Sequence, residues 1–286
     1  MMNRVIDISS FHRAIKDTSS DVRCNFDSQR KWQKKVIKIT EQFRDMYGND
    51  GSLLISKAQG DLNYIAKYIS PLLQKLFKHT NSIVFDWGDS GLSASKDEEH
   101  RAQKDNEVRS RGVTPDGIFR LVEFSTDFAL VEISGPPTIH NHHHYVGDRN
   151  KLGKSLKQIL KSIQQMVNDG DQDLYHEIKL YGIQIYLNTL HLYSLSEPER
   201  GVYVYQEVMS IKIACPVGLL PTSLAKIVRK FWKLKDLILD SANKIELYLK
   251  SDTGAISSDD SDDSRDTVYI SPTKKYKKQS QNAATS

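Results

Sequence analysis

The spacing of the apolar residues changes four times along this chain, and this alternation constrains the fold more than any other feature of the sequence. Apolar side chains recur at intervals of three and four, the spacing of helices, over 29–48, 61–78, 148–168 and 222–250. Between the second and fourth of these segments lie apolar, β-branched runs broken by turn residues, which predict strands. The alternation favours a mixed α/β fold, in which a small sheet is flanked by helices.

The strand-like runs divide into a hairpin and a later group. Residues 119–124 and 128–134 are separated by the polar residues 125–127, which predicts two strands joined by a turn. Three further strands are expected at 180–187, 190–195 and 201–215. The expected order is therefore helices, a hairpin, a helix, three strands and a final helix.

Composition divides the chain into three regions. Residues 251–286 carry 12 Ser or Thr, an acidic run and a basic cluster, and they lack the apolar residues that a core needs, so a disordered tail is predicted. An α/β domain is expected over 81–250, and a helical region over 1–80. The polar stretch 86–112 is expected to be an exposed connection.

Several classes of protein are disfavoured. Only Cys24 and Cys215 are present, so a disulfide scaffold is excluded and a reducing compartment is expected. No stretch approaches the roughly 20 apolar residues that cross a bilayer, which predicts no membrane association. Glycine-rich phosphate-binding motifs are absent, which disfavours kinases, GTPases and simple dehydrogenases. The net charge of +4 is too small to indicate a nucleic-acid-binding protein by itself.

Two carboxylates flank the predicted hairpin. Asp116 precedes its first strand and Glu132 is near the end of its second. Because the end of the second strand lies beside the start of the first, the two side chains are expected to converge. Hard oxygen ligands suit Mg²⁺, which can activate a bound water. Asp116 and Glu132 are therefore the candidate metal ligands, with Mg²⁺ as the possible cofactor. The alternative is that Asp116 belongs to an ordinary turn and that Glu132 lies on a solvated face.

The segments GVTPDGIF, FALVEISGPP, DRNKLGKSLKQIL and LYGIQIY resemble a lineage-expanded group of uncharacterised fungal proteins. Within them, Pro115-Asp116 and Glu132-Ile133-Ser134 in a hairpin followed by a helix resemble the PD-(D/E)XK nuclease superfamily. The resemblance implies a restriction-endonuclease-like core, with Asp116 and Glu132 as its metal-binding acids. Glu41, on the first predicted helix, is the candidate for a further upstream acid.

This chain departs from the superfamily at one position. Ser134 stands where the superfamily has its catalytic lysine, which orients the attacking water and stabilises developing charge. In some such enzymes the lysine comes from the following helix, where Lys151, Lys154 and Lys157 lie. Lys154 forms, with Asp116 and Glu132, the candidate catalytic set.

A histidine cluster comprises His140, His142, His143 and His144. It follows Pro136-Pro137 and lacks the one-face spacing of a helical metal site, so a titrating surface loop is expected, with metal binding as the alternative.

These observations predict a nuclease-like module of impaired activity that binds nucleic acid or protein, in the nucleus or cytoplasm. One alternative is an active Mg²⁺-dependent nuclease that uses Asp116 and Glu132. Another is a protein-interaction scaffold regulated through its tail, where Ser271-Pro272 matches the pattern of proline-directed kinases.

The basic cluster at 274–278 (KKYKK) is of the nuclear-import type. Deleting these residues is expected to move a fluorescent fusion of the chain from the nucleus to the cytoplasm, because the import receptor would lose its basic ligand. Fluorescence microscopy of the full-length and deleted fusions measures this, and an unchanged distribution contradicts the prediction.

Overall fold

A computed structural model describes residues 41–42, 64–78, 80–88, 91–95, 112–135, 139–167, 170–213 and 220–251. Most of the predicted helix over 29–48, the centre of the 86–112 connection and the tail beyond Ser251 lie outside the described residues. None of the helices in the described ranges is both long enough and apolar enough to cross a membrane.

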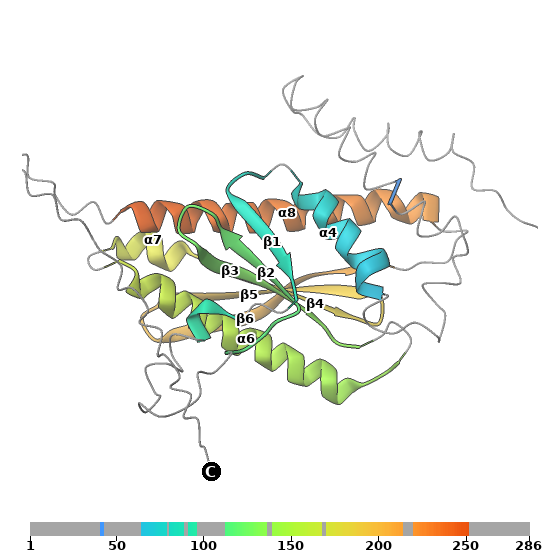
Figure 1. Cartoon of the computed structure of the whole chain (residues 1–286), viewed down its shortest axis with the longest axis horizontal. Coiled ribbons are helices and arrows are strands. Elements are labelled where there is room, and N and C mark those ends of the chain that lie inside the picture. Colours follow the sequence, from blue (N-terminus) through green and yellow to red (C-terminus); the bar gives the residue numbers. More distant parts are fainter. Residues whose placement is uncertain are drawn as a thin grey trace, which may run out of the picture. The chain divides into compact units, whose positions relative to one another are not determined.

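A six-stranded sheet forms the centre of the molecule, and its strands follow one another across the sheet in chain order (Figure 1). The strands are β1 (Ile83–Trp87), β2 (Gly117–Leu121), β3 (Thr126–Ile133), β4 (Leu180–Tyr186), β5 (Thr189–Glu199) and β6 (Val202–Lys212). All neighbouring pairs are antiparallel except β3 and β4, which are parallel. The predicted mixed α/β class is therefore confirmed.

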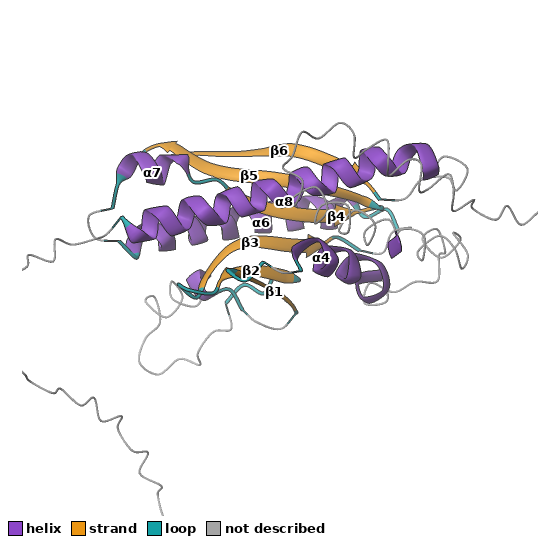
Figure 2. Ribbon diagram, turned by 90° about the horizontal axis from the view of Figure 1, so that it is seen from above, coloured by secondary structure: helices purple, strands orange, loops and turns teal. Residues whose placement is uncertain are grey.

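Helices lie on both sides of this sheet (Figures 1 and 2). They are the π-helical turn η1 (Ile65–Ile69), α4 (Ser70–Phe77), α6 (His142–Gln165), α7 (Gln172–Glu177) and α8 (Leu220–Lys250). The parallel pairing of β3 with β4 requires a crossover, and α6 and α7 provide it. The helix α8 lies on the opposite side of the sheet from α6 (Figure 1). Because helices cover both faces, all eight residues of β3 are buried.

Side chains alternate between the two faces of the central strands. On β4, Gly182 faces α6, where it meets Leu152. Gln184 is two residues further on and shares that face, and its amide nitrogen donates to the carbonyl oxygen of Tyr145 in α6. In the parallel register, Glu132 on β3 pairs with Gln184. The face of the sheet that carries these polar groups is therefore the face that α6 covers.

The hairpin differs from its prediction in the position of its turn. The expected turn at 125–127 is wrong, because β3 already begins at Thr126 and the chain turns before it, with Ser125 in the left-handed region at φ 50°. Asp127 lies in the strand because it has buried partners. Its carboxylate accepts hydrogen bonds from Arg120 Nε at 2.6 Å and from the backbone N–H of Ser93 at 2.9 Å.

Two elements of the structure are absent from the predicted order. Strand β1 ends in Asp86 and Trp87, which the sequence pattern places in the polar connection, yet Asp86 accepts a hydrogen bond from Arg120 on the adjacent strand at 2.9 Å. Helix α7 has six residues, which are too few to show a period. The helix α6 also begins at His142, six residues earlier than expected.

The close packing of α6 on β4 yields a stability prediction. A β-carbon added at Gly182 would lie 2.6 Å from Leu152 Cδ2, so Gly182→Ala should lower the free energy of unfolding by about 1–3 kcal/mol. The matched control is Gly147→Ala in α6, where a β-carbon would meet nothing within 4 Å and helix propensity should raise that free energy by about 0.5–1 kcal/mol. Urea denaturation followed by circular dichroism measures both, and equal effects would contradict this account of the packing.

Candidate functional site

A row of oxygen-bearing side chains crosses three adjacent strands under α6. Asp116 directly precedes β2, Glu132 lies on β3, and Gln184 lies on β4 as the register partner of Glu132. Gly117 pairs with Val131, so Asp116 comes opposite Glu132. Asp116 Oδ2 accepts a hydrogen bond of 2.6 Å from the backbone N–H of Ile133. The structure therefore places the two predicted acids at neighbouring positions, as the hairpin geometry implied.

Glu132 is the buried member of this row. It is only 3% exposed, and its Oε1 lies 2.8 Å from Nζ of Lys151. Lys151 lies on α6 and also donates to the carbonyl oxygen of Thr114 at 2.9 Å, just ahead of Asp116. The Lys151 side chain is 36% exposed, so its ammonium bridges the buried carboxyl and the surface.

Burial dominates the ionisation of Glu132. The pKa of this carboxyl is raised to about 8. Loss of solvation is the main cause, Lys151 opposes the rise, and the neighbouring charges of Asp116 and Asp148 add to it. Burial therefore favours the protonated form of Glu132, whereas the Lys151 ammonium favours the ionised form.

The three candidate lysines of the sequence have different surroundings. Lys151 contacts Glu132, whereas Lys154 is exposed on α6 and Lys157 places its Nζ 4.0 Å from the centre of the Tyr203 ring. The lysine that reaches the predicted acids is therefore Lys151. Glu41 is exposed, in the helical stretch 41–42, whose flanking residues lie outside the described part of the chain.

Ser134, which the sequence resemblance sets at the position of a catalytic lysine, is surrounded by protein on all sides. It is fully buried, its Oγ accepts a hydrogen bond of 2.7 Å from Gln184 Nε2, and its backbone N–H donates to Ile185. Gln184 Nε2 also donates to the carbonyl oxygen of Tyr145 at 2.8 Å, whereas its buried Oε1 has no hydrogen-bond partner among the residues described. These bonds tie β3 and β4 to the first turns of α6.

The histidine cluster is helical in part. The predicted loop is wrong for His142, His143 and His144, which form the first turn of α6, because Asn141 caps that helix by accepting a hydrogen bond from the His144 backbone N–H at 3.0 Å. His144 Nε2 lies 3.1 Å from Asp148 Oδ2, one turn along. All three rings are exposed.

The residues at this site do not fit a resident divalent cation well. Asp116 and Glu132 offer the hard oxygens that Mg²⁺ prefers, but Asp116 accepts a hydrogen bond from a backbone N–H and Glu132 lies beside the Lys151 ammonium. In the ranges that the structure covers, no group of three or more His, Cys, Asp or Glu side chains is placed to hold a metal ion.

Sequence reasoning missed two members of the site, Asp148 and Gln184. Asp148 could have been found from its spacing, because it lies three residues before Lys151 at the start of the predicted helix. No feature of the sequence identifies Gln184, because its place beside Glu132 depends on the parallel register of β3 and β4.

Comparison of the chain with known protein families, with curated proteins and with solved structures found no significant match.

The raised pKa of Glu132 predicts how stability depends on pH. Between its ordinary value of 4.5 and about 8, the folded chain holds a proton that the unfolded chain releases. As the pH rises through this range, the free energy of unfolding of the wild type should therefore fall relative to that of Glu132→Gln, by up to about 1.4 kcal/mol per pH unit. Above pH 8 the difference between the two proteins should level off.

Urea denaturation of the wild type and the Gln variant across this range measures the difference. The raised pKa of Glu132 would be contradicted if the two proteins had parallel stability profiles. It would also be contradicted if the wild type gained stability relative to the variant as the pH rises.

Proposed function

We propose that this chain carries a PD-(D/E)XK-like core that binds nucleic acid and is impaired in cleavage. The observation that carries the proposal is the 2.8 Å contact between Lys151 of α6 and Glu132 of the β2–β3 hairpin. The resemblance in the sequence implies two acids in a hairpin, a helix that follows and a lysine beside the acids. The positions of Asp116, Glu132 and Lys151 support that arrangement, with the lysine supplied from the helix instead of from position 134.

Two features support impairment. Ser134 stands where the superfamily has its lysine, and a divalent cation at Glu132 would have to displace both a proton and the Lys151 ammonium from a buried carboxyl. Binding has no such requirement. Lys151 is partly exposed, so its ammonium can contact a phosphate oxygen at the surface of the site.

The second candidate is an active Mg²⁺-dependent nuclease that uses the same acids. Its specific support is again Lys151, which has the amine that Ser134 lacks and reaches Glu132. The two candidates differ in one measurable respect, which is turnover of nucleic acid in the presence of a divalent cation.

The proposed function predicts binding without cleavage. The full chain should bind labelled DNA or RNA oligonucleotides at pH 7, and Lys151→Gln should weaken binding several-fold and reduce the slope of log affinity against log salt by about one. Fluorescence anisotropy at several salt concentrations measures both quantities. Gel analysis with Mg²⁺ or Mn²⁺ should detect no product.

The matched control is Glu132→Gln, which places a neutral side chain beside Lys151 and should retain binding at pH 7. Failure of the wild type to bind any oligonucleotide contradicts the proposal. Metal-dependent products that disappear in Asp116→Asn would establish the active nuclease in its place.

A further inference from the structure

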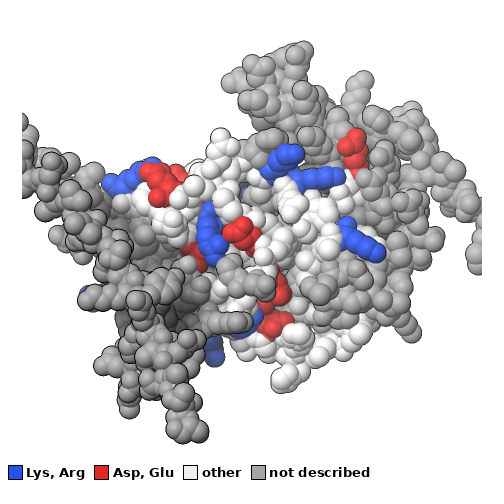
Figure 3. All heavy atoms as spheres, viewed as in Figure 1, with Lys and Arg blue, Asp and Glu red and all other residues white. Residues whose placement is uncertain are grey.

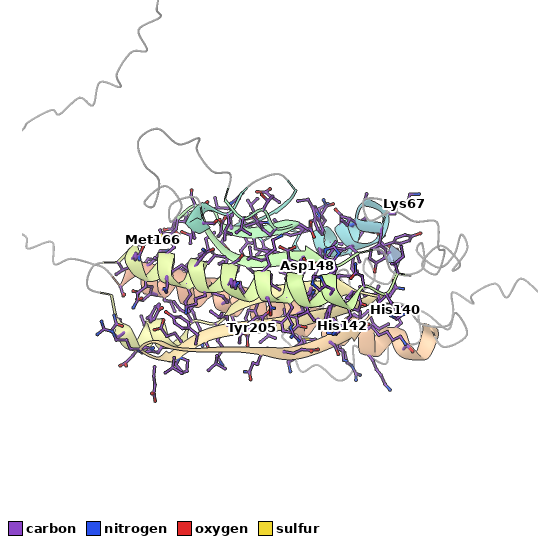
Figure 4. The ribbon with its side chains drawn as sticks, turned by 90° about the horizontal axis from the view of Figure 1, so that it is seen from below. Lys67, His140, His142, Asp148, Met166 and Tyr205 are labelled. Atoms are coloured by element: carbon purple, nitrogen blue, oxygen red, sulfur yellow. The ribbon has the colours of Figure 1, made fainter. Side chains whose placement is uncertain are left out.

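A second set of side chains lines the opposite flank of α6, along its junction with the outer strands. We call this junction the α6–β6 seam. It consists of Tyr145, Arg149 and Lys157 from α6, Tyr193 from β5, and Tyr203 and Tyr205 from β6. All of these residues except Tyr193 are partly exposed. Figure 4 shows Tyr205 on one side of α6 and Asp148, near the Glu132 site, on the other.

The aromatic rings of the seam form a connected series. The rings of Tyr193 and Tyr205 are stacked, with centroids 5.3 Å apart and planes 27° apart. Tyr145 joins this pair through a hydrogen bond of 2.9 Å between its hydroxyl and that of Tyr193, and it stacks on Tyr186 at 4.7 Å. The rings therefore hold one another in place before any ligand arrives.

Positive charges alternate with these rings. The guanidinium carbon of Arg149 lies 5.9 Å from the centre of the Tyr145 ring, and Lys157 Nζ lies 4.0 Å from the centre of the Tyr203 ring. Both are within the range of cation–π attraction. The cations are thus positioned over aromatic faces, next to each other along one flank of a helix.

The close approach of helix and strand depends on a glycine. A β-carbon at Gly153 would lie 3.2 Å from the Tyr205 ring, closer than most side chains allow. The Tyr205 hydroxyl then donates to the carbonyl oxygen of Arg149 at 3.2 Å. Because β6 is an edge strand, the seam lies at the border of the sheet, where solvent reaches its side chains.

The charge of α6 favours a polyanion as the occupant. This helix carries five basic residues, Arg149, Lys151, Lys154, Lys157 and Lys161, and one acidic residue, Asp148. The acids near the seam are engaged: Glu197 accepts hydrogen bonds from the hydroxyls of Tyr175 and Tyr203, and Glu207 contacts His191 at 3.1 Å. On the face shown in Figure 3, basic and acidic side chains lie next to one another.

From this combination we infer that the α6–β6 seam is the binding surface for a single-stranded nucleic acid. The inference rests on the proposed function and names its substrate class. Proteins that bind single strands combine cations that follow the phosphates with aromatic rings on which the bases stack. In the seam, a base would stack on the Tyr145 or Tyr203 ring by displacing Arg149 or Lys157 from its face, and the displaced cation would then contact a phosphate. A duplex keeps its bases paired and stacked, so it can use the cations of the seam but not its rings.

The length of the seam suits a short stretch of nucleotides. Tyr145 and Lys157 are twelve residues apart on α6, which corresponds to about 18 Å at 1.5 Å per residue. At about 3.4 Å per stacked nucleotide, this length accommodates about five nucleotides.

Fluorescence anisotropy of the full chain with a labelled oligothymidylate and with a DNA duplex of equal length tests the inference. We expect tighter binding of the single strand, and a loss of about tenfold or more in its affinity for Arg149→Gln/Lys157→Gln. The matched control is Lys226→Gln/Lys233→Gln, which removes two exposed charges from α8 and should leave the affinity unchanged.

A second pair of variants tests the rings separately from the charges. Tyr145→Phe keeps the ring and should retain binding, whereas Tyr145→Leu should lose at least fivefold in affinity for the single strand. Circular dichroism and thermal unfolding identify any variant that fails to fold, and the charge variants then carry the test, because their side chains are partly exposed.

The outcomes distinguish this inference from the proposed function. Binding of single strand and duplex that is equal and insensitive to the seam variants, but weakened by Lys151→Gln, overturns the seam and leaves the proposed function standing. Absence of any nucleic-acid binding overturns both. Sensitivity to the seam variants, with preference for the single strand, supports both.

Discussion

The parallel pairing of β3 with β4 is the constraint on which the rest of the structure depends. Antiparallel neighbours need only a turn, but parallel strands need a crossover, and in this fold the crossover contains the 24-residue helix α6. The pairing places Gln184 beside Glu132, and the helix that the crossover supplies brings Lys151 to the same point. Hydrogen bonds from Gln184 to Ser134 and to Tyr145 then link both strands to the start of that helix. The candidate site therefore follows from the topology.

Burial of Glu132 under α6 has opposite consequences for metal ligation and for phosphate binding. An ionised carboxylate would be costly at 3% exposure, so the group retains its proton up to about pH 8. Because the helix packs on the sheet, a divalent cation at Glu132 would have to displace a proton, whereas a phosphate at the partly exposed Lys151 would not. This difference is the physical basis on which we propose binding without cleavage.

The sequence predicted the parts of this structure that have a period. The segments that form α6, β4, β5 and α8 are recognisable because a buried face repeats along each of them. Strand β1 has five residues, and its Asp86 is polar because it binds Arg120 on the next strand, a contact that no local pattern reveals. The turn was misplaced because Asp127 is a turn-forming residue in general but is buried in this hairpin by its own partners. Long-range pairing, and not propensity, decided both.

The choice among the lysines of α6 shows why site residues are harder to predict than helices. Each residue turns a helix by about 100°, so Lys151 and Lys157 lie about 120° apart around the axis, on opposite flanks. Lys154 lies between them, on the outward face, and it is exposed. The sequence pattern identifies the helix but does not show which of its flanks meets Glu132. It therefore cannot tell which of the three lysines reaches that residue. The same geometry joins the two surfaces, because Lys154 extends the positive charge of the helix from Lys151 to the seam. A polyanion that crosses the outward face of α6 would therefore meet Lys151, Lys154 and Lys157 in turn.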